Sequence, residues 1–234
     1  RKVDLVLLCS VDNLALQSAV PRLQKAKIPL ITFSNTIGNH PQGNYPGVLA
    51  HIGRDEVKSG EMLAKMVEKL FHNDPTNIFF IQGAPGTSAQ RMREKGFLRI
   101  THQHKNWNIV SNRYIPGWTK EGALNATQDF LQTGKRVDVI VTQWWAAAIA
   151  SAMALKEKGI SGVKVVGLEF SGELIPYLAS GRVDITTYFS IMEEGFKSAE
   201  TAGLYLRKRT ISNFVEIVPI WITEKNFHKF KPEL

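Results

Sequence analysis

Short apolar segments alternate with amphipathic segments along the whole chain. Apolar runs of the length of a buried strand predict strands at residues 5–8, 28–33, 78–81, 108–114, 137–142, 163–168, 184–189 and 216–222. Helical periodicity predicts helices at residues 14–23, 56–71, 87–102, 120–131, 146–158, 173–179 and 193–207. Strands that alternate with helices are typical of βαβ units, so the pattern predicts an α/β fold built on parallel sheets.

Three places interrupt this regular pattern. Asp12 is a candidate N-cap for the helix at 14–23, and Pro21 is expected to kink or shorten that helix. Pro176 interrupts the short helix predicted at 173–179. The loop at 35–46 is unusually long for a connection between two elements.

Composition and charge exclude several classes of protein. The chain has 234 residues, of which 44% are hydrophobic and 21% charged, which is typical of a globular protein. No apolar run approaches ~18 residues, so no membrane-spanning helix is predicted. The net charge is +8, but the basic residues are scattered, and those at 207–209 complement the dipole of a helix end. No basic motif with interleaved aromatic residues accompanies the charge, so no nucleic-acid partner is predicted.

Motifs for catalysis, metals and cofactors are missing from the sequence. The single cysteine, Cys9, permits neither an internal disulfide nor a cysteine metal cluster. His102 and His104 lack a third ligand nearby. The loop at 83–86 lacks the Gly-Lys-Ser/Thr of a nucleotide site, although its backbone N–H groups are suited to a ligand hydroxyl or anionic group. We therefore predict a protein that is not an enzyme and that needs no cofactor or metal.

Polar and aromatic side chains follow the predicted strands. They occur at residues 9–10, 34–35, 82–84, 143–145, 169–171 and 189–190. Because ligands bind beyond the carboxyl ends of strands in open α/β sheets, these positions predict a small-molecule site. The alternative for Trp144 and Trp145 is that they plug the edge of a lobe, since aromatic residues are more often core than ligand contacts.

Several segments together resemble one family. Residues 82–97, QGAPGTSAQRMREKGF, are similar to the loop and helix QG-xxGTSA-xR-xR-xxGF of the type I periplasmic binding proteins, in the ribose-binding-like branch that serves sugar importers. Residues 3–30, 51–55, 165–169 and 218–226 also resemble segments of that family. The resemblance covers essentially the whole chain and is strong because the segments occur together.

The resemblance implies two Rossmann-like lobes with parallel sheets, joined by a hinge of several strands. Residues 1–54 with 190–218 are expected to form the N-terminal lobe, and residues 55–189 with 219–234 the C-terminal lobe. Family members begin with a further strand, helix and strand, so the chain is expected to be truncated at its N-terminus. A ligand in the cleft between the lobes would stabilise the closed state, which a membrane permease of the ABC class would read. The expected location is the periplasm, or the outer face of the membrane through a lipid anchor.

The resemblance also implies the ligand contacts. Matching positions give Ser34, Asn35, Arg93, Trp118, Trp144, Glu169 and Phe189, and the position of ligands beyond strand ends adds Cys9 and Ala84. Ser34-Asn35 replaces the family's usual Asp-Arg, and Trp144 and Phe189 replace an Asn and a Gln. Losing these polar groups disfavours binding of the usual pentose or hexose, because each unmet buried group costs ~1–3 kcal/mol. The remaining aromatic faces and Glu169 favour a smaller or less hydroxylated ligand, with a cationic ligand as a further hypothesis.

Other interpretations stay open at this level. Arg93 has the alternative of pairing with Glu169 instead of the ligand, Trp118 that of a surface staple, and Cys9 that of a small buried residue. For the function, the first alternative is a sensing domain that signals to a membrane sensor kinase or chemoreceptor. The second is the effector domain of a LacI-like repressor, which needs an upstream helix-turn-helix that this chain does not contain.

Overall fold

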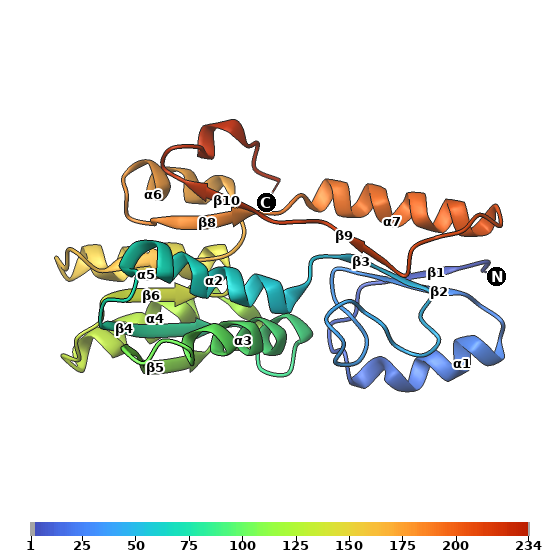
Figure 1. Ribbon diagram of the computed structural model, residues 1–234, viewed down its shortest axis with the longest axis horizontal. Helices are drawn as coiled ribbons and strands as arrows, with labels where there is room; N and C mark the ends of the chain where they lie inside the picture. Colours follow the sequence, from blue (N-terminus) through green and yellow to red (C-terminus); the bar gives the residue numbers. More distant parts are fainter. Residues whose placement is uncertain (1–2, 234) are drawn as a thin grey trace. The chain divides into compact units, whose positions relative to one another are not determined.

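The computed structural model describes residues 3–233 and divides the chain into two compact units. Unit 1 consists of Arg1–Glu56, Gly86–Met92 and Ser190–Val218, and unit 2 of Val57–Pro85, Arg93–Phe189 and Pro219–Leu234. Each unit contains its own sheet with helices on both faces (Figure 1), which confirms the predicted α/β class. In the described part of the chain, the helices are too short or too polar to cross a membrane.

Unit 1 is built on a parallel four-stranded sheet in the order β1-β2-β3-β9. Its strands are β1 (Val6–Leu8), β2 (Leu30–Phe33), β3 (Ala50–Gly53) and β9 (Phe214–Glu216). The helices α1 (Ala19–Lys25) and α7 (Ile191–Leu206) lie on opposite faces of this sheet (Figure 1). Because side chains alternate along a strand, Leu30 packs in the cluster with Val20 of α1, and Ile31 in the cluster with Ala202 of α7.

Unit 2 is built on a six-stranded sheet in the order β10-β8-β7-β6-β4-β5. Its strands are β4 (Thr76–Gln82), β5 (Trp107–Tyr114), β6 (Val139–Thr142), β7 (Lys164–Val166), β8 (Ile185–Tyr188) and β10 (Ile220–Thr223). Only β10 is antiparallel, to its neighbour β8. The edge of this sheet that collects the carboxyl ends of β4, β6 and β7 carries the candidate site.

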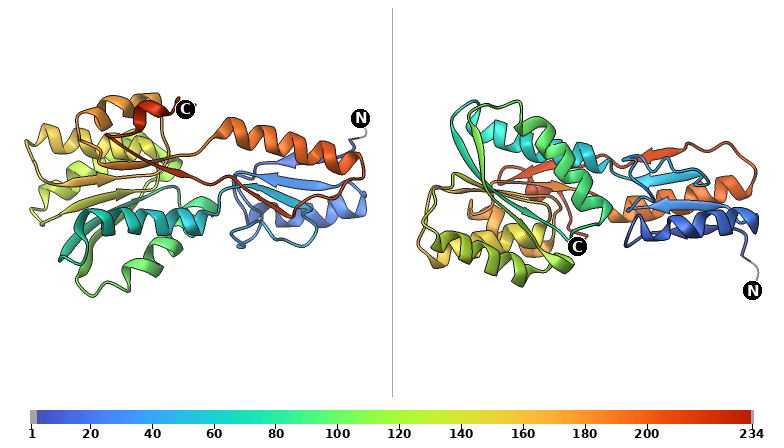
Figure 2. Two further views of the ribbon diagram at one scale, coloured as in Figure 1. Left: turned by 45° about the horizontal axis from the view of Figure 1, so that its top comes forward. Right: turned by 90° about the horizontal axis from the view of Figure 1, so that it is seen from below.

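Helices cover both faces of the unit 2 sheet (Figure 2). They are α2 (Glu56–Phe71), α3 (Ser88–Thr101), α4 (Lys120–Gln132), α5 (Trp145–Glu157) and α6 (Ile175–Ala179). Two consecutive phenylalanines of β4 point to opposite faces of the sheet. Phe79 stacks on Phe130 of α4, with ring centroids 4.3 Å apart, and Phe80 packs on Phe97 of α3, with ring centroids 4.4 Å apart.

Two glycines set the position of α3 against α2. A Cβ atom on Gly60 would lie 1.9 Å from the carbonyl oxygen of Arg93, and one on Gly96 would lie 1.9 Å from the carbonyl oxygen of Val57. No side chain fits at either position, so the two helix backbones approach closely. This contact holds the turn of α3 that carries Arg93.

The structure corrects the expected elements in three places. The segment predicted as a strand at 216–222 forms two strands in different sheets, β9 and β10, separated by Val218 and Pro219. The sequence pattern did not predict β3 as a strand, because this short strand includes the polar His51. Pro176 does not interrupt a helix: it lies in the first turn of α6, where its missing N–H costs nothing.

The segment after Asp12 is shorter than a helix over 14–23. The Asp12 carboxylate accepts the N–H groups of Leu14 and Ala15, at 2.8 and 3.0 Å, as a capping residue does. The following residues form a 3₁₀ turn, η1 (Ala15–Ser18), and then α1. Pro21 lies in the first turn of α1, so it accompanies the shortening that was expected.

Candidate functional site

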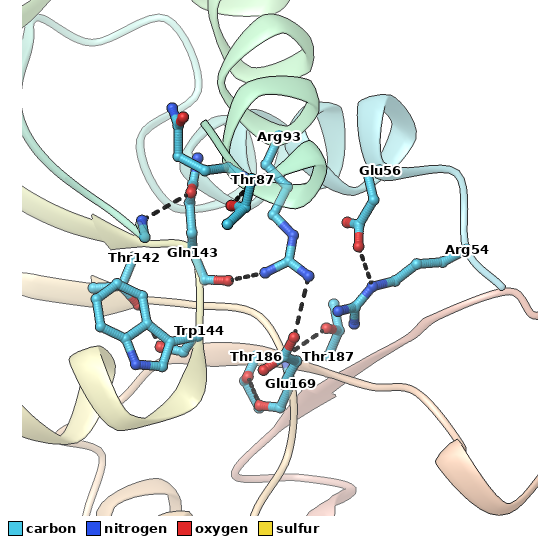
Figure 3. Close-up of polar contacts among 12 residues, drawn as sticks. Arg54, Glu56, Thr87, Arg93, Thr142, Gln143, Trp144, Glu169, Thr186 and Thr187 are labelled. Atoms are coloured by element: carbon cyan, nitrogen blue, oxygen red, sulfur yellow. Dashed lines mark hydrogen bonds and ion pairs between the residues drawn. The ribbon is translucent and has the colours of Figure 1, made fainter. Parts of the chain in front are cut away.

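Arg93 contacts two other predicted site residues of unit 2, Trp118 and Glu169, and also the backbone of Gln143. Its side chain is 3% exposed and extends from α3, where one guanidinium nitrogen lies 3.1 Å from Glu169 Oε1. A second nitrogen donates to the carbonyl oxygen of Gln143 at the end of β6 (Figure 3). The guanidinium also lies over the ring of Trp118, 5.5 Å from its centroid. The side chain is thereby held by a carboxylate, a carbonyl and an aromatic face at once.

The Trp118 ring lies against bare backbone. A Cβ atom on Gly83 would lie 2.1 Å from two atoms of this ring, so only glycine fits at the end of β4. Trp118 is also in edge contact with Trp144, with ring centroids 5.3 Å apart and planes at 82°. The ring is half-buried, so it is packed in place and still reachable. This packing is inconsistent with a loose staple on the surface.

A buried amide network joins the ends of β4 and β6. Gln143 Oε1 accepts the Gly83 N–H at 3.1 Å, and Gln143 Nε2 donates to Gln82 Oε1 at 3.3 Å. Gln82 Nε2 in turn donates to Glu94 and Asn112, each at 2.8 Å. From the sequence, these glutamines are distinguishable only as polar residues at strand ends. Their role is to fix the backbone on which Trp118 rests.

Threonines of β8 bind both backbone polar groups of Glu169. Its N–H donates to Thr187 Oγ1 at 3.0 Å, and its carbonyl oxygen accepts from Thr186 Oγ1 at 2.6 Å. Its side chain is 18% exposed, so the carboxylate pairs with Arg93 and remains open to solvent. The alternative in which Arg93 pairs with Glu169 is therefore realised in the structure. A partly open carboxylate beside a guanidinium remains suited to polar ligand groups.

Three of the predicted site residues have a strained backbone. Of the described non-glycine residues, six have a left-handed φ. Lys27, His72 and Lys208 come just after helices, where such a conformation ends a helix. The others are the predicted site residues Ser34 (φ 57°), Trp118 (φ 56°) and Glu169 (φ 72°). Strain of this kind costs ~1–3 kcal/mol per residue and is concentrated at functional sites.

The remaining candidates of unit 2 differ in accessibility. Trp144 is 4% exposed and belongs to the main hydrophobic cluster, which is the packing role that the sequence analysis kept as its alternative. Trp145 packs against the same cluster. Ala84 and Phe189 are half-buried. The ring of Trp118 is therefore more accessible to a ligand than the ring of Trp144.

The three candidates of unit 1 follow adjacent strands. Cys9 comes just after β1, and Ser34 and Asn35 just after β2. The Asn35 side-chain amide contacts Cys9 Sγ at 3.8 Å. Cys9 is exposed, so it is not a small buried residue. The carboxyl edge of this sheet thus presents a thiol, a hydroxyl and an amide.

Charged and titratable groups gather where β3 ends in unit 1. Arg54 Nε lies 3.0 Å from Glu56 Oε1 (Figure 3). Burial lowers the pKa of His51 to about 4, opposed by the Glu56 carboxylate and by a hydrogen bond with Thr32. Burial also raises the pKa of Glu194, at the start of α7, to about 7; the Glu56 carboxylate adds to this rise, and Arg54 and the Ser34 N–H oppose it. Neither His51 nor Glu194 is among the functional residues predicted from the sequence.

Of the two histidines at 102 and 104, His104 has a structural role. His104 stacks on Trp107 with ring centroids 3.9 Å apart, and its Nε2 lies 2.9 Å from Glu68 Oε1. Within residues 3–233 there is no group of three or more His, Cys, Asp or Glu side chains arranged to hold a metal ion.

Comparisons with known proteins show which family and fold this chain is similar to. Residues 1–210 match the family described as the periplasmic binding protein domain. The ribose import binding protein RbsB of Escherichia coli (strain K12) is 27% identical over 207 residues, which cover 88% of this chain and 67% of that protein. The fructose import binding protein FruE of Bifidobacterium longum (strain NCC 2705) is 23% identical over 219 residues, which cover 92% of this chain and 65% of that protein.

Solved structures share the fold at lower identity. An ABC transporter solute binding protein from Bacillus halodurans C-125, with bound myo-inositol, has a TM-score of 0.88 at 22% identity and covers 97% of this chain and 77% of its own. A periplasmic solute binding protein from Actinobacillus succinogenes 130z, with bound D-allose, has a TM-score of 0.85 at 22% identity. The match covers 98% of this chain and 81% of that protein. These likenesses establish the fold of the chain.

Proposed function

Because this chain belongs to the periplasmic binding protein domain family, we propose that it captures a sugar or sugar-like polyol and delivers it to an ABC importer. Members of this family bind solutes and are not enzymes, in agreement with the prediction from the sequence. We place its site of action outside the cytoplasmic membrane, in the periplasm or on the outer surface through a lipid anchor.

The observation that carries the proposal is the arrangement of Arg93, Glu169 and Trp118. The exposed part of an aromatic ring offers an apolar surface to the C–H groups of a sugar, while the rim of hydroxyls needs both donors and acceptors. Arg93 supplies only donors and the Glu169 carboxylate only acceptors. Their separation of 3.1 Å places both kinds of group beside the Trp118 ring.

A neutral ligand fits this arrangement better than a cationic one. The cationic hypothesis needs the Trp118 face and the Glu169 carboxylate to be available to the charge of the ligand. Arg93 already lies over that ring and pairs with that carboxylate. A cationic ligand would bring a second positive charge next to the Arg93 guanidinium, so we favour a neutral polyol.

The proposed contacts are assigned to each unit by itself. In unit 2 they are Ala84, Arg93, Trp118, Glu169 and Phe189, with Trp144 supporting Trp118 from the core. In unit 1 they are Cys9, Ser34 and Asn35. The unit 1 set contains no charged side chain, so recognition there rests on neutral hydrogen-bonding groups.

Calorimetric titration tests the proposal. The panel contains D-ribose, D-fructose, xylitol and myo-inositol, with choline as the cationic probe. We expect one of the neutral polyols to bind and E169A to weaken its binding. The matched control is E173A, because Glu173 is an exposed carboxylate of the same unit that pairs with Lys120 at 2.9 Å.

Sensing is the second candidate function. The fold also occurs in the fructose binding periplasmic domain of the hybrid two component system BT1754, with a TM-score of 0.86 at 17% identity. We propose transport first, because the curated relatives named above are import binding proteins. Stimulation of a reconstituted permease ATPase by the liganded chain supports transport, whereas activation of a membrane kinase with no effect on the permease supports sensing.

A further inference from the structure

Two buried polar atoms of unit 1 face the same glycine. His51 Nε2 and Glu194 Oε1 have no hydrogen-bond partner among the described residues. His51 is 0% exposed and Glu194 is 6% exposed, so solvent does not compensate either atom. A Cβ atom on Gly53 would lie 3.3 Å from His51 Nε2 and 3.1 Å from Glu194 Oε1. The missing side chain of Gly53 is what allows both groups to approach.

The same small space also touches the end of β2. The Cβ position of Gly53 is 3.4 Å from the backbone nitrogen of Ser34. Ser34 has a left-handed φ of 57° and precedes Asn35, both of them candidate ligand contacts. Its N–H donates to the Ile52 carbonyl at 2.9 Å, so the turn at Ser34 is tied to β3 by this bond. Three elements thus converge: α7 through Glu194, β3 through His51, and the end of β2 through Ser34.

The charges around Glu194 come from the chain that leaves β3. Arg54 lowers the pKa of Glu194 and Glu56 raises it. The two side chains also pair with each other at 3.0 Å. His51, on β3, is neutral at neutral pH because its burial disfavours the charged form. Glu216, on β9, is in register with Gly53. The backbone N–H of Ser34 therefore faces the Glu194 carboxyl group as a hydrogen-bond donor. An ionised carboxylate attracts such a donor more strongly than a neutral carbonyl does.

We propose that Glu194 is a positioning residue for the turn at Ser34 and Asn35. The protonation state of Glu194 determines how firmly this turn is hydrogen-bonded to β3. With the proton on Glu194, the Ser34 N–H stays with the Ile52 carbonyl, and the turn keeps its left-handed geometry. When the carboxyl ionises, it competes for that N–H and loosens the bond that ties Ser34 to β3. The consequence for ligand affinity rests on the proposed function, whereas the effect on the turn does not.

The test follows the Ser34 and Asn35 amide resonances of the whole chain by NMR as the pH is raised. We expect both to titrate in the wild type with a midpoint at the Glu194 pKa of about 7. The E194Q variant, which keeps a neutral side chain of the same shape, should remove this titration. The matched control is E193Q, because Glu193 is the exposed neighbour on the same helix and should leave the titration unchanged.

Ligand titration in the same samples separates this inference from the proposed function. With D-ribose as the probe, the wild type should bind about tenfold more weakly at about pH 8.5 than at about pH 6, and E194Q should bind equally at both. If D-ribose does not bind but the amides titrate as described, the positioning role stands and ribose is not the ligand. If the Ser34 amide does not titrate in the wild type, or titrates equally in E194Q, the positioning role is wrong.

Discussion

One guanidinium nitrogen of Arg93 lies 3.1 Å from Glu169 Oε1, and the two residues come from a helix and a strand end that are far apart in the sequence. This pair sits at the carboxyl edge of the unit 2 sheet, beside the Trp118 ring. Because Arg93 is almost completely buried, Glu169 compensates a charge that solvent does not reach.

Removal of the Glu169 carboxylate should therefore affect both stability and binding. E169A removes the Glu169 carboxylate that lies beside the buried Arg93, so we expect a loss of about 1–3 kcal/mol in the free energy of unfolding. We also expect weaker sugar binding, since the ligand loses the acceptor. Urea unfolding and calorimetry measure the two effects. An E169A protein that keeps both wild-type stability and wild-type affinity would contradict the role given to this pair.

Gly83→Ala should displace Trp118 from its position. The added methyl group would lie 2.1 Å from the indole ring, and the ring has to move because the opposing atoms belong to a fixed strand end. We expect a change in tryptophan fluorescence and a loss of about 1–3 kcal/mol in stability, the range found for overpacked sites. G172A is the control, since a Cβ atom there meets ordinary contacts at 3.9 Å. Equal behaviour of the two variants would show that the ring does not depend on Gly83.

The stability of unit 1 should depend on pH through two groups that act in opposite directions. The pKa of Glu194 is raised from 4.5 to about 7 on folding, so its contribution is complete below pH 4.5 and is lost as the pH rises toward 7. The pKa of His51 is lowered from 6.5 to about 4, so its contribution is complete above pH 6.5 and is lost as the pH falls toward 4. The two slopes offset each other across most of this range.

Single variants should expose each slope. In E194Q, the free energy of unfolding should rise between about pH 4 and 6.5 through His51 alone, by up to ~3 kcal/mol. In H51Q, it should fall between about pH 4.5 and 7 through Glu194 alone, by a similar amount. Chemical unfolding at a series of pH values measures both. Parallel curves for the two variants would show that these groups do not control the pH dependence.

Regular elements were predictable where one local pattern decides the structure. The helix predicted at 56–71 is observed over the same residues, because its apolar side chains repeat every four residues and pack on the sheet. β3 was not predicted, since Ala50, His51 and Gly53 do not form an apolar run, and the burial of His51 depends on Thr32 and Phe214 from other strands. The split between β9 and β10 depends equally on which sheet each half joins.

The candidate site was predictable to the extent that strand ends and the family resemblance define it. The residues around Arg93 were named from the resemblance, and the structure brings Arg93, Trp118 and Glu169 together. The supporting residues were not predictable in this role. Gln143 acts through Gln82 and Gly83 from another strand, and Glu194 acts beside Gly53, so their function depends on contacts between distant parts of the chain.

We propose that Arg93, Trp118 and Glu169 together bind a neutral polyol. Calorimetric titration of the wild-type chain with D-ribose, D-fructose, xylitol, myo-inositol and choline tests it most directly, with E169A and E173A measured beside it. We expect one of the polyols to bind, choline not to bind, and E169A to weaken the binding while E173A does not. Binding of choline alone, or polyol binding that E169A leaves unchanged, would contradict it.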